Sequence, residues 1–140
     1  MSNGLGLDAY VRFLGRLENT CAFYNMLDLF VMPSFYEGMS NSILEAMSCE
    51  VPVCVSDIPS NREIFARAKA HSLCIGECFA AFKARSIADS VVHLLRNDPL
   101  HRLGENARKI VVMNYAIGQR IELEMHYYSE NQRNRTAAIT

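Results

Sequence analysis

Residues 29–47 have the sequence LFVMPSFYEGMSNSILEAM, and the fold that we expect follows mainly from them. Its apolar beginning, which stops at Pro33, predicts a short buried strand. Gly38 and the polar residues 40–42 then supply the turn and cap chemistry that precede a helix. The stretch therefore predicts a strand, a tight loop and the start of a helix, with Glu37 and Glu45 eight positions apart.

A loop of this kind offers an anion site. The first N–H groups of a helix have no partner within the helix and carry the positive end of its dipole, so phosphate is a natural ligand. In this interpretation Glu37 and Glu45 bind hydroxyl groups near the phosphate. In a purely structural interpretation, Ser42 and Glu45 form a capping box and Glu37 is a solvated loop acid. The residues alone leave both interpretations open.

Beyond this stretch, the hydrophobic pattern predicts strands and helices in alternation. The predicted strands cover residues 10–14, 29–33, 51–56 and 73–75. The predicted helices cover residues 18–27, 42–49, 60–70, 86–97, 100–113 and 117–129, and a capping box at residues 60–63 begins the third of them. Alternation of this kind predicts an α/β domain with a parallel, doubly wound sheet over residues 1–130. Residues 131–140 are expected to form a disordered tail.

Composition narrows the possible functions. The chain of 140 residues has the size of one domain, and its net charge of −1 gives no basic field for nucleic acid, so no nucleic-acid partner is expected. No metal site is predicted, because the cysteines form no Cys-x-x-Cys pair and no histidine stands at zinc-ligand spacing from them. The five cysteines are expected to be reduced thiols (Cys21, Cys49, Cys54, Cys74 and Cys78). No leader or membrane-spanning run is recognised, which predicts a soluble, cytoplasmic protein without a transmembrane segment.

The order of motifs in residues 33–57 resembles the donor-binding half of glycosyltransferase family 4. Pro-Ser is followed by Glu-Gly and by Leu-Glu-Ala-Met, and then by Val-Pro-Val and Ser-Asp. The paired-glutamate motif of that family, Glu-x7-Glu, is present as Glu37 and Glu45, and the resemblance covers roughly residues 9–128. It implies a Rossmann-like three-layer α/β domain with a mostly parallel sheet, which is part of the C-terminal domain of the two-domain GT-B fold.

The resemblance also implies roles for individual residues. Glu37 is the expected catalytic residue and contacts the sugar hydroxyls, the backbone N–H groups of about residues 40–43 bind phosphate, and Glu45 binds the ribose. The whole expected donor-binding set is Glu37, Gly38, Met39, Ser40, Asn41, Ser42, Ile43 and Glu45. The implied substrate is a UDP- or GDP-linked sugar, transferred with retention of configuration and without a metal or other cofactor. The alternatives are a non-catalytic nucleotide or phosphosugar-binding module and a degenerate interaction protein.

The chain departs from the family pattern in several places. A family enzyme has about twice this length or more, and two strands with a Gly-Arg-rich loop are expected upstream of residues 10–14. The resemblance therefore implies a chain truncated at its N-terminal side, which we do not expect to catalyse transfer without an N-terminal domain or a partner chain. Such a domain would also provide any contact with a membrane. Glu50 stands where glycine commonly ends a helix, and residues 69–72 replace a glycine-rich turn.

The missing strands leave a gap in the expected sheet. The strand at residues 10–14 either pairs with a different neighbour, stays exposed or is joined by another chain, because unpaired edges are templates for association. We expect marginal stability or a homo-oligomer formed through this edge.

Overall fold

The structure is a computed structural model that describes residues 6–81 and 83–116. Its centre is a parallel sheet of β1 (Phe30–Met32), β2 (Val53–Ser56) and β3 (Gly76–Phe79), in the order β1-β2-β3. Phe30 aligns with Val53 on one side of β2, and Val53 aligns with Gly76 on the other. Every residue of β2 is buried, as its central position requires. The α/β prediction with a parallel sheet is confirmed.

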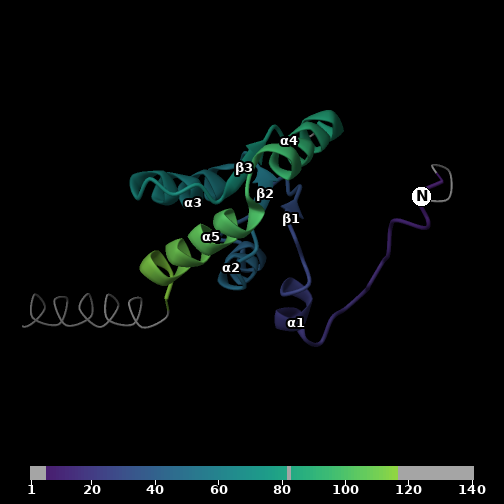
Figure 1. Cartoon of the computed structure of the whole chain (residues 1–140), viewed down its shortest axis with the longest axis horizontal. Coiled ribbons are helices and arrows are strands. Elements are labelled where there is room, and N and C mark those ends of the chain that lie inside the picture. Colours follow the sequence, from purple (N-terminus) through teal and green to yellow (C-terminus); the bar gives the residue numbers. More distant parts are fainter. Residues whose placement is uncertain (1–5, 82, 117–140) are drawn as a thin grey trace, which may run out of the picture.

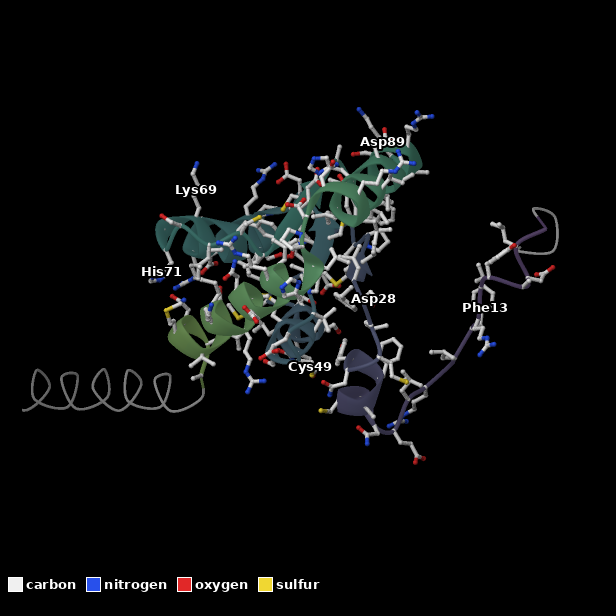
Figure 2. The ribbon with its side chains drawn as sticks, viewed as in Figure 1. Phe13, Asp28, Cys49, Lys69, His71 and Asp89 are labelled. Carbon is white, nitrogen blue, oxygen red and sulfur yellow. The ribbon has the colours of Figure 1, made fainter. Side chains whose placement is uncertain are left out.

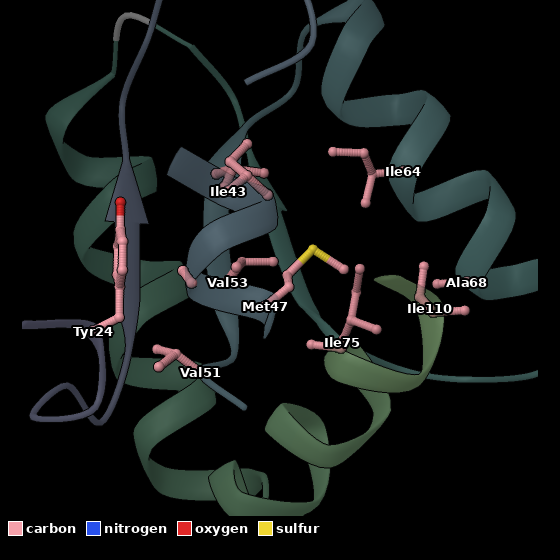
Figure 3. Close-up of a cluster of buried hydrophobic side chains, with 12 residues drawn as sticks. Tyr24, Ile43, Met47, Val51, Val53, Ile64, Ala68, Ile75 and Ile110 are labelled. Carbon is pink, nitrogen blue, oxygen red and sulfur yellow. The ribbon is translucent and has the colours of Figure 1, made fainter. Parts of the chain in front are cut away.

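Helices cover both faces of this sheet (Figure 1). They are α1 (Thr20–Tyr24), α2 (Asn41–Ser48), α3 (Pro59–Ala70), α4 (Ala84–Asn97) and α5 (Leu100–Asn114). Val53 and Val55 of β2 pack with apolar residues of α2, α3 and α5 in one core cluster (Figure 3). Cys54, which points to the opposite face, packs with Leu94 of α4 in a second cluster. The result is the three-layer, Rossmann-like arrangement expected from the sequence.

The prediction of a strand at residues 10–14 is wrong. These residues have no regular structure and all are exposed; the side chain of Phe13 has an exposed fraction of 84%. The segment runs away from the sheet (Figure 1), and Phe13 stands clear of the packed helices (Figure 2). An apolar, strand-like pattern forms a strand only beside a partner, and no described strand lies next to this segment. Of the three alternatives given for residues 10–14, the described part of the chain shows the one in which the segment stays exposed.

The first helix is also shorter than predicted. We expected residues 18–27, but α1 covers only Thr20–Tyr24. The Asn19 side chain accepts a hydrogen bond from the Ala22 N–H at 2.9 Å and so begins the helix late. At the other end the Cys21 carbonyl accepts from both the backbone N–H and the side chain of Asn25, at 3.1 Å and 2.9 Å. The next two N–H groups, those of Met26 and Leu27, bond carbonyls only three residues back, so the α-helical ladder ends here.

The strand predicted at residues 73–75 lies further along the chain, in β3. The Leu73 N–H still bonds the Ala68 carbonyl at 2.9 Å, so the chain is completing the end of α3 at this point. The Ile75 carbonyl accepts from the Val53 N–H of β2 at 3.1 Å, and the first aligned residue of β3 is Gly76, whose φ is 142°. A Cβ atom there would lie 1.8 Å from the Val53 carbonyl oxygen, so this close approach of two strands requires glycine.

The other predicted strands and helices lie within a few residues of their observed positions. The predicted reason for the start of α3 is wrong. α3 begins at Pro59 after Ile58, and no side chain caps it, so the predicted capping box at Ser60 is wrong. Proline at the first helical position replaces it, because its fixed φ suits the helix and its missing N–H needs no partner. The Ser60 hydroxyl has no hydrogen-bond partner among the described residues. The predicted helix at 117–129 and the tail at 131–140 lie outside those residues.

Two non-glycine residues take the left-handed conformation at the turns that close α2 and α3. Glu50 has φ of 61° and Ser72 has φ of 57°, so both positions that depart from the expected glycines carry backbone strain. α5 packs tightly on the first of these turns. A Cβ atom on Gly104 would lie 1.8 Å from the Glu50 carbonyl oxygen, and Arg108 donates to the Ser48 carbonyl at 2.9 Å.

Candidate functional site

The predicted loop joins the carboxyl end of β1 to the start of α2. Ser40 is the residue before the helix; its side chain is buried and donates to the Met32 sulfur at 3.4 Å, so it makes no cap bond. The capping box of Ser42 and Glu45 is therefore wrong, because it requires Ser42 as the residue before the helix, and that residue is Ser40, two positions earlier. No described side chain caps this helix, which leaves the first-turn N–H groups of residues 41–43 for a ligand.

Glu37 is held by a relay of serines that starts in the centre of the sheet. Ser56, the fully buried last residue of β2, donates its hydroxyl to the Ser34 carbonyl at 2.5 Å. The Ser34 hydroxyl in turn donates to Oε1 of Glu37 at 3.1 Å. Two loops at the carboxyl ends of neighbouring parallel strands are thus joined, and the Glu37 carboxylate has a fixed position beside them. Ser34 and Ser56 were quoted in the motif but received no role from sequence reasoning.

Glu45 has a different environment, on the side of α2 that faces α1. With Tyr24 and Asn41 it lines an open hollow of about 550 Å³ that also touches α5. Tyr24 packs edge-on against Phe30, with ring centroids 5.7 Å apart. Burial raises the pKa of the Tyr24 hydroxyl, the nearby Ser42 hydroxyl opposes this rise, and the negative charge of Glu45 adds to it. Tyr24 is a further residue of this region that the sequence prediction left without a role.

The other predicted donor-binding residues gather around the start of α2. Gly38, Met39, Asn41 and Ser42 are exposed, so their backbone and side chains face solvent. Ile43 is different, because its side chain is fully buried in the core and only its backbone is available to a ligand (Figure 3). The loop and the first turn of α2 thus form one open surface, with Glu37 at its start and Glu45 one turn into the helix.

This surface carries no positive side chain of its own. The sequence contains neither lysine nor arginine between Arg16 and Arg62. Arg62 pairs with Asp57, which follows β2, through contacts of 2.6 Å and 3.0 Å. Hydrogen bonding to that guanidinium lowers the pKa of Asp57. The positive electrostatic contribution at the site therefore comes from the N-terminus of α2.

Two further properties of the described residues bear on function. They contain no cluster of three or more histidine, cysteine, aspartate or glutamate side chains arranged to hold a metal ion. None of their helices combines the length and the apolar character that crossing a membrane requires.

A strand, an uncapped helix N-terminus and a pair of hydrogen-bonded serines at the carboxyl end of a parallel sheet are features of an α/β domain. The model of the glycosyl transferases group 1 family matches residues 1–110. The chain belongs to this family.

Curated relatives agree with this membership. The chain is 31% identical over 109 residues to the N-acetyl-alpha-D-glucosaminyl L-malate synthase of Bacillus anthracis, covering 76% of this chain and 27% of the relative. It is 30% identical over 115 residues to the lipopolysaccharide core biosynthesis mannosyltransferase LpsB of Rhizobium meliloti, covering 81% of this chain and 32% of the relative. The chain thus spans between a quarter and a third of the length of these relatives.

Solved structures show the same fold. Sucrose-phosphate synthase from Thermosynechococcus elongatus superposes with a TM-score of 0.78 at 22% identity, over 95% of this chain and 33% of that protein. The C-terminal domain of a glycosyl transferase group 1 family protein from Francisella tularensis superposes with a TM-score of 0.68 at 24% identity, over 82% of this chain and 58% of that chain. Both likenesses concern the fold alone.

Proposed function

We propose that the chain is the donor-binding portion of a retaining, metal-independent glycosyltransferase of family 4, which transfers a sugar from a UDP- or GDP-linked donor. The observation that carries this proposal is the uncapped start of α2 directly after Glu37, whose carboxylate is bonded to Ser34. A diphosphate at this helix end accepts hydrogen bonds from residues 41–43. Membership of the glycosyl transferases group 1 family supports the same assignment.

In this proposal the phosphate is both a binding group and the leaving group. As the bond between sugar and phosphate breaks, negative charge grows on the phosphate oxygens. The fixed N–H dipoles stabilise the transition state, which carries this additional charge, more than they stabilise the bound substrate. Glu37 accepts hydrogen bonds from the sugar hydroxyls, and Glu45 accepts them from the ribose. Neither glutamate acts as the acid or the nucleophile of a glycosidase pair. No metal ion or other cofactor takes part.

The proposed activity requires more protein than this chain. The chain spans 27% and 32% of the two curated relatives above, and residues 17–61, which include the proposed site, contain no lysine or arginine to neutralise a diphosphate. We propose that an N-terminal domain or a partner chain supplies the acceptor site and the missing positive charge.

The absence of cationic residues between Arg16 and Arg62 also favours a second candidate function. A module with the helix end and the two glutamates but without countercharges binds a nucleotide or phosphosugar weakly and does not stabilise a leaving diphosphate. It would act as an accessory subunit, or only as an interaction protein if it binds no nucleotide.

Calorimetric titration of the purified chain with UDP, GDP and their sugar conjugates tests the proposal. We expect binding that the Glu45→Ala variant weakens about tenfold, since it loses a charged hydrogen-bond acceptor. The matched control is Glu105→Ala, which removes an exposed carboxylate from α5 and is expected to leave binding unchanged. No binding by a folded chain contradicts the proposal. Binding without transfer, even after an N-terminal partner domain is added, selects the accessory module.

A further inference from the structure

Tyr24 is a buried residue beside the proposed donor site. It is the last residue of α1, and only 6% of its surface is exposed. Its ring packs edge-on against Phe30 of β1 and belongs to the larger core cluster. In Figure 3 its hydroxyl points toward the Ile43 side of this cluster and away from Val51. Because the ring is packed in the core, its hydroxyl has a fixed place near the first turn of α2.

Two polar side chains of α2 lie close to this hydroxyl. Burial is the largest cause of the raised pKa of Tyr24; hydrogen bonding with Ser42 lowers this pKa, whereas the charge of Glu45 and hydrogen bonding with it raise it. A donor to the phenol oxygen stabilises the charged form of a tyrosine, and an acceptor stabilises the neutral form. These directions are those of a hydroxyl that accepts from Ser42 and donates to the Glu45 carboxylate. Tyr24 and Glu45 also line the same hollow, which places them together independently.

Glu45 is a side chain that such a neighbour can fix. It is exposed on α2, and its carboxylate ends a flexible side chain. No described lysine or arginine pairs with it. Ordering a flexible side chain when a ligand binds lowers affinity by up to about tenfold. A carboxylate that Tyr24 already holds avoids part of this loss.

We propose that Tyr24 is a positioning residue of the donor site: its buried hydroxyl holds the Glu45 carboxylate toward the ribose, and the chain therefore selects ribonucleotides over deoxyribonucleotides. This inference rests on the proposed function, in which Glu45 binds the ribose. A deoxyribose lacks one ribose hydroxyl and leaves part of a fixed carboxylate unpaired. A carboxylate that rotates freely turns to solvent instead, so the selectivity depends on whether Glu45 is held.

Calorimetric titration of the full chain with UDP and GDP, and with their deoxyribose analogues dUDP and dGDP, tests this role. For the wild-type chain we expect the ribonucleotide to bind about tenfold more tightly than its analogue. Tyr24→Phe keeps the buried ring and removes only the hydroxyl. We expect it to weaken ribonucleotide binding about five- to tenfold and to leave the analogue nearly unchanged, so that the selectivity disappears. The matched control is Tyr115→Phe, expected to keep the wild-type selectivity, because the Tyr115 hydroxyl lines the same hollow and has no hydrogen-bond partner among the described residues.

A double variant shows whether Tyr24 acts through Glu45. If it does, Glu45→Ala already abolishes the selectivity, and adding Tyr24→Phe changes neither the affinity nor the selectivity further. A Tyr24→Phe chain that circular dichroism shows to be folded, and that keeps the wild-type selectivity, overturns the inference and leaves the proposed function intact. So do additive effects of the two substitutions, or a wild-type chain that binds ribonucleotide and analogue equally. A wild-type chain that binds none of these nucleotides contradicts the proposed function itself, and the inference with it.

Discussion

The two ends of the sheet differ in how their loops are held in place. At the carboxyl end, the loop after β1 is open to solvent and is positioned by serine side chains, from Ser56 through Ser34 to Glu37. At the amino end, the turns before β2 and β3 are strained at Glu50 and Ser72 and are packed without space for a side chain on Gly76 or Gly104. The carboxyl end is therefore open and held by side-chain hydrogen bonds, whereas the amino end is closely packed and strained.

The largest expected effect concerns the closely packed amino end. Gly76→Ala places a Cβ atom 1.8 Å from the Val53 carbonyl oxygen, in a backbone conformation that side chains rarely adopt. We expect a loss of about 3 kcal/mol or more of unfolding free energy, measured by urea denaturation. The control is Gly38→Ala at the carboxyl end, where nothing lies within 4 Å of the added atom, and its stability is expected to be unchanged. Equal losses of unfolding free energy for the two variants would contradict the difference in packing between the two ends.

A smaller effect is expected from the serine relay at the carboxyl end. Ser56→Ala removes the buried hydroxyl that donates to the Ser34 carbonyl, and we expect a loss of about 1 kcal/mol of unfolding free energy. Because Glu37 then loses its fixed position, affinity for a UDP-sugar is expected to fall more than affinity for UDP, as calorimetry will measure. Ser48→Ala is the control, since it removes an exposed hydroxyl that bonds Leu44. Unchanged binding by a folded Ser56→Ala chain would mean that the relay only supports the fold.

At the amino end, relief of strain gives an effect of the opposite sign. Glu50→Gly is expected to stabilise the chain by about 1 kcal/mol, because glycine adopts the left-handed conformation without steric cost. The lost contact with Arg108, at 3.7 Å and solvent-exposed, contributes little. Glu50→Ala separates the two causes, since it removes the charge and keeps the Cβ atom. A stabilisation by alanine as large as that by glycine would show that charge, and not backbone strain, is responsible.

The smallest effect is a dependence of stability on pH at the carboxyl end of β2. Hydrogen bonding to Arg62 lowers the pKa of Asp57 in the folded chain, so the contribution of this pair is fully present above the ordinary aspartate pKa and is lost as pH falls through the lowered value. Both side chains are exposed, and solvent therefore keeps the effect small. Comparison of the urea midpoints of wild type and Asp57→Asn, at neutral pH and in acid, measures it. An Asp57→Asn chain with the same acid sensitivity as wild type would contradict this assignment.

The sequence predicted the centre of the fold well and its margins poorly, for physical reasons. In the β2 region and in α5, the apolar residues follow a pattern that fits only one kind of element, a strand in the first and a helix in the second. The predicted bounds, residues 51–56 and 100–113, lie close to the observed ones. The segment at residues 10–14 has an equally strand-like pattern and forms no strand, because a strand depends on a neighbour that local sequence cannot reveal.

The candidate site shows the same division. The positions of Glu37, the turn and the start of α2 follow from local chemistry and from the motif. The link from Ser56 to Ser34 spans 22 residues of sequence and exists only because two parallel strands end side by side, so local reasoning gave no signal for it. The predicted capping residue, Ser42, lies two residues after the observed one, Ser40, whose side chain makes no cap bond, and the helix end is therefore uncapped.

The central claim is that the first turn of α2, at the carboxyl end of the sheet, binds the diphosphate of a nucleotide. The most direct test is a titration of the isotopically labelled chain with UDP, followed by the amide resonances in two-dimensional NMR spectra. We expect the largest shifts at the N–H groups of residues 41–43, with smaller shifts around Glu37 and Glu45 and none at the turns of Glu50 and Ser72. Shifts that are absent from residues 41–43, or that concentrate at the amino-end turns, would contradict the claim.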